Sequence, residues 1–386
     1  MFSNLSGSSV VDSLEQIVST LQSIEQLYLD YHDIAVLGAK FLDILVDKAS
    51  FSLANHSSVI FNIFLAMQST IHQKEGSAAL EPLAEKLAKV LGYSSSSEMY
   101  SAEVKDFMER LYLAKDYKSW HKFSKDRFKF EVILRHCKEG IPTYIEPILD
   151  VISTCTQPDK DPELKFDMLV MLEFIIDSPS AEECLRTHSL ELIKRILIQT
   201  IVWRSGKPSI KIRKAAIVLY SKVLNKKLIQ PESLHKLYQD TVSNLKNCLD
   251  DDWASDLRLV SIQFLRQLIE YLKDKLDQIE LSNLYQLLLA RLDDAQDTIR
   301  IETTGALKAF FACPNMYMSD SVFEYVCQTL FVHLDDKNEE VQLAVFRTLE
   351  LAATYRKELV LQEVSKSNTR QRSHFQNKSS QDSVRS

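Results

Sequence analysis

The feature that most constrains the fold is a triplet of one leucine and two aspartates that recurs in the second half of the chain. It stands at 249–251, 292–294 and 334–336, at intervals of 43 and 42 residues. A repeat period of about 40–47 residues is typical of two-helix HEAT or armadillo units. One such unit cannot bury its own apolar face, so neighbouring units must stack on it. The repeat therefore predicts an all-α solenoid of stacked antiparallel helix pairs.

A polar ladder is a second periodic feature of the same units. Three aspartates spaced by 42 residues each lie six residues before an arginine or a glutamine: Asp252, Asp294 and Asp336 precede Arg258, Arg300 and Gln342. We expect each aspartate to begin a second helix and to accept from its free N–H groups. The side chain that follows is expected to reach the aspartate of the adjacent unit and so to fix how the repeats stack. The alternative is a set of independent helix caps followed by solvated arginines.

The apolar residues around the ladder support helices throughout. They step by three and four, as expected for one buried helix face, at Leu257, Val260, Phe264 and Leu268, at Ile299, Thr303, Ala306 and Phe310, and at Val341, Val345, Leu349 and Ala352. Glycine, which makes up roughly 7% of an average chain, contributes only 7 of 386 residues, too few for many hairpin turns. Upstream the ladder is incomplete: Arg213 lies 45 residues before Arg258, but Lys207 stands where an aspartate would be expected.

These patterns predict four regions. HEAT repeats occupy 123–358 and more degenerate helical repeats occupy 10–122, while 1–9 form a flexible N-terminus. The last segment, 359–386, is polar and basic and is expected to be disordered. Residues 363–386 carry a net charge of +3 within a chain of net charge −7, which leaves −10 for the remainder. An acidic body argues against nucleic acid as the main partner.

Sites for catalysis or cofactors have little support in the sequence. The six cysteines are scattered without a C-x-x-C pair, and His136 beside Cys137 is expected to be a helix residue and not a metal ligand. No phosphate-binding loop, nucleophile elbow or dinucleotide fingerprint occurs. The apolar runs are far shorter than the ~18–20 residues that span a bilayer. We therefore expect no enzymatic activity, no cofactor, no metal and no membrane partner.

One tryptophan stands out as a candidate contact residue. Trp203 lies in the segment VWRSGK, at an expected helix end before a short loop. Tryptophan is enriched among the residues that dominate protein interfaces, so Trp203 is a possible partner contact. The alternative is that its ring wedges between neighbouring helices.

Five segments resemble those of a known family, in the same order and with similar spacing. They are RFKFEVI at 127–133, DPEL at 161–164, VWRSGK at 202–207, LARLDD at 289–294 and VHLDD at 332–336. Together they resemble the C-terminal half of the dynein axonemal assembly factor 5 family of HEAT-repeat proteins, over about residues 123–350.

The resemblance implies a function that rests on binding. It implies a cytoplasmic scaffold, expected to be monomeric, for preassembly of the outer and inner dynein arms of motile cilia. The expected partners are axonemal dynein intermediate and heavy chains and chaperones or other assembly factors. A general HEAT-repeat adaptor, of the transport or phosphatase-scaffold type, is the alternative.

Overall fold

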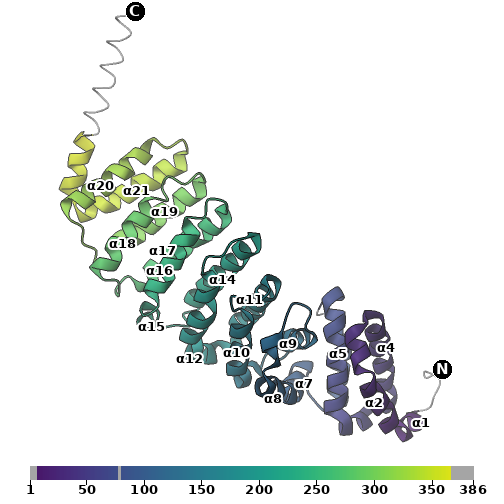
Figure 1. Ribbon diagram of the computed structural model, residues 1–386. Coiled ribbons are helices and arrows are strands. Elements are labelled where there is room, and N and C mark those ends of the chain that lie inside the picture. Colours follow the sequence, from purple (N-terminus) through teal and green to yellow (C-terminus); the bar gives the residue numbers. More distant parts are fainter. Residues whose placement is uncertain (1–6, 77–79, 367–386) are drawn as a thin grey trace, which may run out of the picture. The chain divides into compact units, whose positions relative to one another are not determined.

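A computed structural model describes residues 7–76 and 80–366, and every regular element within them is a helix (Figure 1). The helices pack in series, which confirms the predicted all-α solenoid class. The chain divides into two compact units between Ile196 and Leu197. The predicted change from degenerate to regular repeats, between 122 and 123, lies inside the first unit, where α9 (Lys125–His136) packs against α5 (Ser57–Glu75).

The first unit is built from helices of uneven length. Besides α5 and α9 it contains α1 (Gly7–Asp12), α2 (Leu14–Ser23), α3 (Glu25–Asp30), α4 (His32–Ala49), α6 (Glu81–Val90), α7 (Ser96–Glu103), α8 (Lys105–Ala114), α10 (Ile145–Cys155), α11 (Pro162–Asp177) and α12 (Glu182–Leu192). Helix α5 lies at the centre, against α3, α4 and α9, and even its polar residues Gln68, Ser69 and Thr70 are buried. A π-helical turn, Ile193–Leu197, follows α12 at the boundary.

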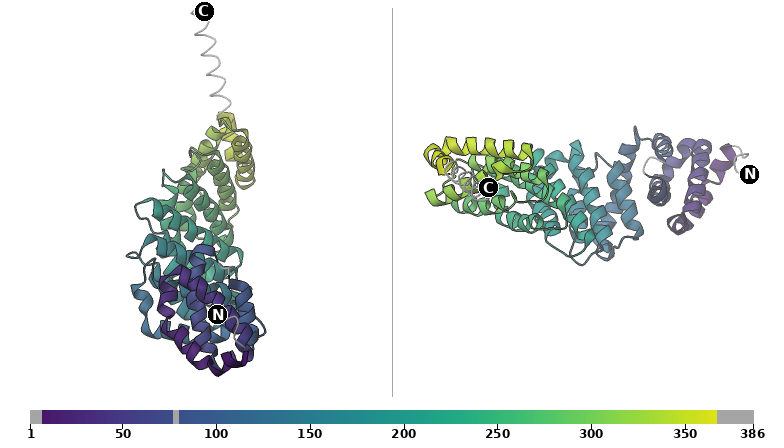
Figure 2. Two further views of the ribbon diagram at one scale, coloured as in Figure 1. Left: turned by 90° about the vertical axis from the view of Figure 1, so that its right-hand side faces the viewer. Right: turned by 90° about the horizontal axis from the view of Figure 1, so that it is seen from above.

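The second unit repeats one arrangement. After α13 (Ile198–Ile201), α14 (Lys207–Asn225) and the short α15 (Pro231–His235), three helix pairs follow: α16 (Tyr238–Leu249) with α17 (Ser255–Leu272), α18 (Gln278–Leu289) with α19 (Asp297–Phe311), and α20 (Asp320–Val332) with α21 (Glu339–Tyr355). The second helices stack side by side, α14 on α17, α17 on α19 and α19 on α21 (Figure 2). The predicted apolar stripes face this stacking: of their twelve residues only Val260 is not fully buried.

Several helices begin where local chemistry satisfies their free N–H groups. The Asp277 carboxylate accepts from the Glu280 N–H, and the Glu280 side chain accepts from the Asp277 N–H, which makes a capping box at α18. The Asn338 side chain accepts from the N–H groups of Glu340 and Val341 at α21. These caps hold the connecting loops at a defined angle to each helix.

The two ends differ in part from the predictions. Residues 7–9, predicted to be flexible, begin α1, and 1–6 lie outside the described residues. The predicted disordered segment 359–386 overlaps a helix that spans 357–366, because Val360 and Glu363 are buried there. Its remainder, 367–386, lies outside the described residues. None of the described helices is both long and apolar enough to cross a membrane.

Candidate protein-binding surfaces

The ladder in the second unit consists of ion pairs between consecutive repeats. Arg258 on α17 donates from Nε to Asp294 Oδ2 (2.7 Å) and from its second terminal nitrogen to Asp294 Oδ1 (3.0 Å). The same guanidinium donates to the backbone carbonyls of Asp251 and Asp252. The two side chains are only 7% and 2% exposed. Arg258 therefore joins the loop of its own repeat to that of the next.

The next repeat has the same arrangement. Arg300 donates to Asp336 Oδ1 (3.0 Å) and lies beside Asp336 Oδ2 (3.0 Å), and it also donates to the Asp294 carbonyl. Gln342 stands at the equivalent position of the last repeat and donates to the Asp336 carbonyl (2.6 Å). It makes the bond within its own repeat but has no charge to extend the ladder.

One predicted member, Asp252, is not part of the ladder. Its side chain is exposed, and the preceding residue, Asp251, accepts from Arg213 (2.8 Å). The reason is a loop that is one residue longer: Asp251 lies seven residues before Arg258, whereas Asp294 and Asp336 lie six before Arg300 and Gln342. The leucine–aspartate triplets contained this register, since Asp251, Asp294 and Asp336 are each the third residue of a triplet.

The aspartates shape the loops and do not cap the helices. Asp294 accepts from the Gln296 N–H (3.0 Å) and Asp336 from the Asn338 N–H (2.9 Å), and both donors belong to residues that precede a helix. Burial opposes ionisation of Asp294, but the bonds from Arg258 and from the Gln296 N–H outweigh it and lower the pKa of its carboxyl. The ladder is thus charged at neutral pH.

Two tryptophans are exposed in the loops of this unit. Trp203 follows α13 and is 55% exposed. Trp253, between α16 and α17, is 95% exposed, the most of the large apolar side chains in the described residues. Sequence reasoning missed Trp253, which lies beside three aspartates and outside every apolar stripe. A tryptophan in a polar segment between two amphipathic stretches is the sequence signal that could have found it.

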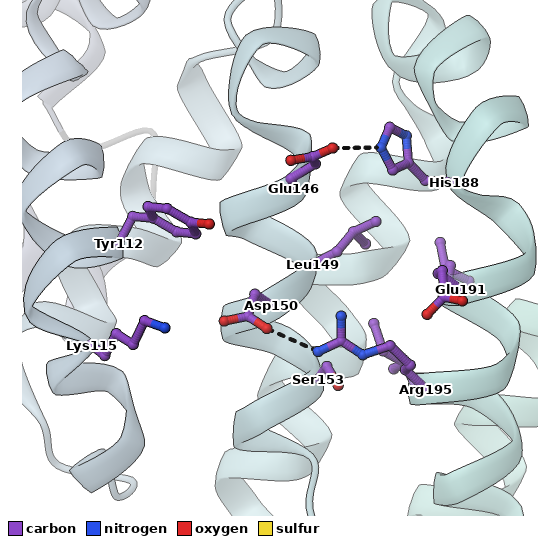
Figure 3. Close-up of a pocket in the computed structure, with 11 residues that line it drawn as sticks. Tyr112, Lys115, Glu146, Leu149, Asp150, Ser153, His188, Glu191 and Arg195 are labelled. Atoms are coloured by element: carbon purple, nitrogen blue, oxygen red, sulfur yellow. Dashed lines mark hydrogen bonds and ion pairs between the residues drawn. The ribbon is translucent and has the colours of Figure 1, made fainter.

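A groove of about 340 Å³ lies on the first unit between α8, α10 and α12 (Figure 3). Two ion pairs cross it from α10: Glu146 pairs with His188 on α12 (3.5 Å), and Asp150 pairs with Arg195 in the π-helical turn after α12 (2.9 Å). Burial opposes ionisation of Asp150, but bonds from Tyr117 and Arg195 lower the pKa of its carboxyl. Four of the charged side chains of the groove are thus paired with each other, and Tyr112 is half-exposed at its edge.

The residues considered as metal ligands are engaged elsewhere. His136 ends α9, and its ring stacks on Tyr100 with 4.9 Å between ring centres. Cys137 is buried, and burial raises the pKa of its thiol. In residues 7–76 and 80–366 no group of three His, Cys, Asp or Glu side chains is placed to hold a metal ion.

Comparison with known proteins finds similarity to one kind of protein. No known family model matches the chain. Dynein axonemal assembly factor 5 of Mus musculus is 23% identical over 299 residues, which are 74% of this chain and 35% of that protein. The protein of the same name from Xenopus laevis is 21% identical over 286 residues (72% and 34%), and that of Homo sapiens is 22% identical over 275 residues (69% and 32%).

The similarity is distant and covers part of those proteins. The chain spans about a third of the length of the curated relatives it matches. Among solved structures, the crystal structure of an engineered protein aligns with 90% of this chain and 98% of its own, at 14% identity and a TM-score of 0.41, a level from which nothing further follows. By its sequence the chain is distantly similar to part of dynein axonemal assembly factor 5.

Proposed function

We propose that this chain is a non-catalytic HEAT-repeat scaffold for the cytoplasmic preassembly of outer and inner axonemal dynein arms, acting through protein–protein binding. The observation that carries the proposal is the similarity of 69–74% of the chain to proteins named for dynein axonemal assembly. The proposed partners are axonemal dynein intermediate and heavy chains together with chaperones or other assembly factors. The protein is proposed to work as a monomer.

The ladder supports a scaffold function because its ion pairs hold consecutive repeats in a fixed position relative to each other. Each Arg–Asp pair, such as Arg258 with Asp294, connects two loops at the starts of neighbouring second helices. A repeat surface binds through a face to which several units contribute, so a fixed register between units preserves that face. The paired charges of the groove between α8, α10 and α12 also favour contact over acid–base chemistry, because Glu146 and Asp150 already have cationic partners.

The function is tested in ciliated cells that lack this protein. Electron micrographs of their axonemes should show missing outer and inner dynein arms while dynein transcripts stay normal. Re-expression of the Lys275→Ala variant should restore the arms, because this lysine makes only an exposed pair with Glu232. Arg258→Ala should fail to restore them, because it breaks a buried pair. Intact arms in the knockout, with no dynein chain recovered on the tagged protein, would refute the assembly role and leave a general HEAT adaptor.

A further inference from the structure

Two loops at one edge of the second unit are held together as neighbours. The loop at 202–206 leads into α14, and the loop at 250–254 leads into α17. Arg213 on α14 donates to Asp251 in the second loop (2.8 Å), and Cys248 Sγ lies 4.0 Å from the Ile201 carbonyl oxygen at the start of the first. Arg213 is 1% exposed. A buried bond therefore fixes the loop at 250–254 to α14, the helix that follows the loop at 202–206.

Each of these neighbouring loops presents an indole to solvent, Trp203 at 55% and Trp253 at 95% exposure. The third tryptophan of the chain, Trp120, is 5% exposed in the first unit. An exposed tryptophan leaves a large apolar area in water. Covering that area gains about 25 cal/mol of free energy per Å². Residues of this type dominate binding energy where a partner covers them. The two neighbouring loops thus each carry one exposed indole, and nothing of the described chain covers Trp253.

The charge around this surface is positive beside α14. That helix carries Lys207, Lys211, Arg213, Lys214 and Lys222 and no acidic residue. Arg213 pairs with Asp251 and Lys214 pairs with Asp256. Within the described residues Arg204, Lys207 and Lys211 have no ion pair, and all three are exposed.

The charge on the other side is negative. Asp252 is exposed beside Trp253, and its carboxylate has no cationic partner among the described residues. Asp250 in the same loop pairs with Arg291 (3.3 Å). The surface thus has three unpaired cations on the side of α14 and one unpaired carboxylate on the side of α17.

We propose that Trp203, Trp253, Arg204, Lys207 and Lys211 form a docking surface for an acidic protein segment that also carries apolar side chains. The acidic residues of the segment lie against Arg204, Lys207 and Lys211, and its apolar side chains cover the two indoles. Asp252 sets the direction, because it repels acidic residues from the Trp253 end. This inference rests on the proposed function, since it assigns a class of partner to a scaffold.

Purified full-length protein and synthetic peptides test the surface. The probe is a peptide of about 15 residues with glutamates in its first half and leucine and phenylalanine in its second, and its control replaces every glutamate by glutamine. Binding should shift the tryptophan emission, since two of the three indoles are exposed. The double variant Trp203→Phe with Trp253→Phe should abolish that emission shift. Fluorescence anisotropy of a labelled peptide should show that this variant binds the peptide more weakly. Equal binding of the glutamate and glutamine peptides would overturn the proposal.

Two charge variants should change the Kd for the acidic peptide in opposite directions. Lys207→Glu with Lys211→Glu should raise the Kd for the acidic peptide about tenfold, because two exposed attractions become repulsions. Asp252→Asn should lower it about twofold to threefold, because one repulsion is removed. Lys236→Glu with Lys273→Glu reverses two exposed lysines away from these loops and should leave the Kd unchanged. Identical effects of both lysine pairs would mean attraction by net charge alone and would refute the surface.

Other occupants give distinct results. A labelled single-stranded oligonucleotide that bound as tightly as the acidic peptide would overturn the assignment to protein segments. A concentration-dependent dimer in sedimentation, lost in the Trp253→Ser variant, would assign the surface to a second copy of the chain. Failure of the peptide to bind while dynein chains are still recovered on the Trp203→Phe, Trp253→Phe protein would sink this inference and leave the proposed function standing.

Discussion

The two units solve the same packing problem with different polar contacts. In the second unit the buried ion pairs repeat: Arg213, Arg258 and Arg300 each reach an aspartate 36–38 residues further on. In the first unit Arg127 makes a similar contact with Asp167, 40 residues further on, but other buried polar contacts follow no period. Tyr100 donates to Gln68, 32 residues away, and Lys129 donates to Glu25, 104 residues away (2.9 Å).

The difference concerns where the polar groups lie. In the second unit they sit at the starts of the second helices, where carbonyls of the preceding loop can share the guanidinium, as those of Asp251 and Asp252 do for Arg258. In the first unit one buried cluster lies inside the helix packing around α5, where His72 contacts Glu131 (3.2 Å) and Glu131 accepts from Arg135 (2.8 Å). An ion pair that recurs in each repeat sets the stacking register of the repeats. A cluster that occurs once stabilises only the helices around it.

The largest expected difference between the two units comes from removing one ion pair of the ladder. Arg258→Ala leaves the Asp294 carboxylate, 2% exposed, without its cation, so we expect a loss of about 3–5 kcal/mol in unfolding free energy. Lys275→Ala, which removes an exposed inter-repeat pair, should cost about 0–1 kcal/mol. Hydrogen exchange should show lost protection in α17 and α19, the helices on either side of the rung. Equal losses for the two variants would show that the ladder is not a stabilising feature.

The first unit should respond to acid through Glu131. Burial opposes its ionisation, but bonds from His72 and Arg135 outweigh that effect and lower the pKa of its carboxyl to about 2. A depressed pKa means that its contribution is complete above the unfolded value of about 4.5 and is lost as pH falls toward 2. Glu131→Gln should therefore cost about 2–3 kcal/mol at pH 7, and the difference from wild type should shrink between pH 4.5 and 2.

Urea titrations followed by hydrogen exchange in α9 would measure this, with Glu163→Gln as the exposed control. The control carboxylate is 69% exposed, so its substitution should change little at any pH. A Glu131→Gln difference that stays constant from pH 7 to 2 would mean that the cluster acts through shape and not through charge.

A double-mutant cycle sharpens the description of the ladder itself. Arg300→Ala with Asp336→Ala should show a coupling of about 1–2 kcal/mol, because the two groups form a largely buried pair. Arg258→Ala with Asp252→Ala should be additive within about 0.5 kcal/mol, since only the backbone carbonyl of Asp252 contacts that arginine. If Arg258 coupled to Asp252 as strongly as to Asp294, Asp252 would belong to the ladder, as the 42-residue spacing predicts.

The repeating parts of the molecule could be predicted from sequence and the unique parts could not. The triplets and apolar stripes predicted helix pairs and their stacking because each unit must bury the same face. The register at Asp252 was wrong by one residue, since a single extra loop residue leaves the helical period unchanged. The contact of Gln68 with Tyr100 leaves no periodic trace in the sequence. Trp253 was missed for a related reason, because exposure of a loop side chain has no sequence period.

The smallest expected effect is on thiol reactivity. The labelling rates of buried cysteines measure how often each unit opens locally. In the first unit Cys137 and Cys155 are buried and Cys184 is partly exposed; in the second Cys248, Cys313 and Cys327 are buried. Burial raises the pKa of Cys155 to about 12 and that of Cys248 to about 11, so even a thiol that a reagent reaches at pH 8 is mostly protonated. Cys184 should therefore be labelled first by a thiol reagent.

Cys248 provides the sharpest comparison, because its sulfur lies 4.0 Å from the guanidinium of Arg213, beneath the first rung. Labelling of this thiol requires the loop at 250–254 to separate from α14. Arg213→Ala removes the bond to Asp251, so Cys248 labelling should accelerate about tenfold or more while Cys155 in the first unit stays slow. Mass spectrometry of the labelled peptides over time measures both rates in one sample. If Cys155 accelerated as much as Cys248, the rung would not control local opening, and the repeated and unique contacts would stabilise their units in the same way.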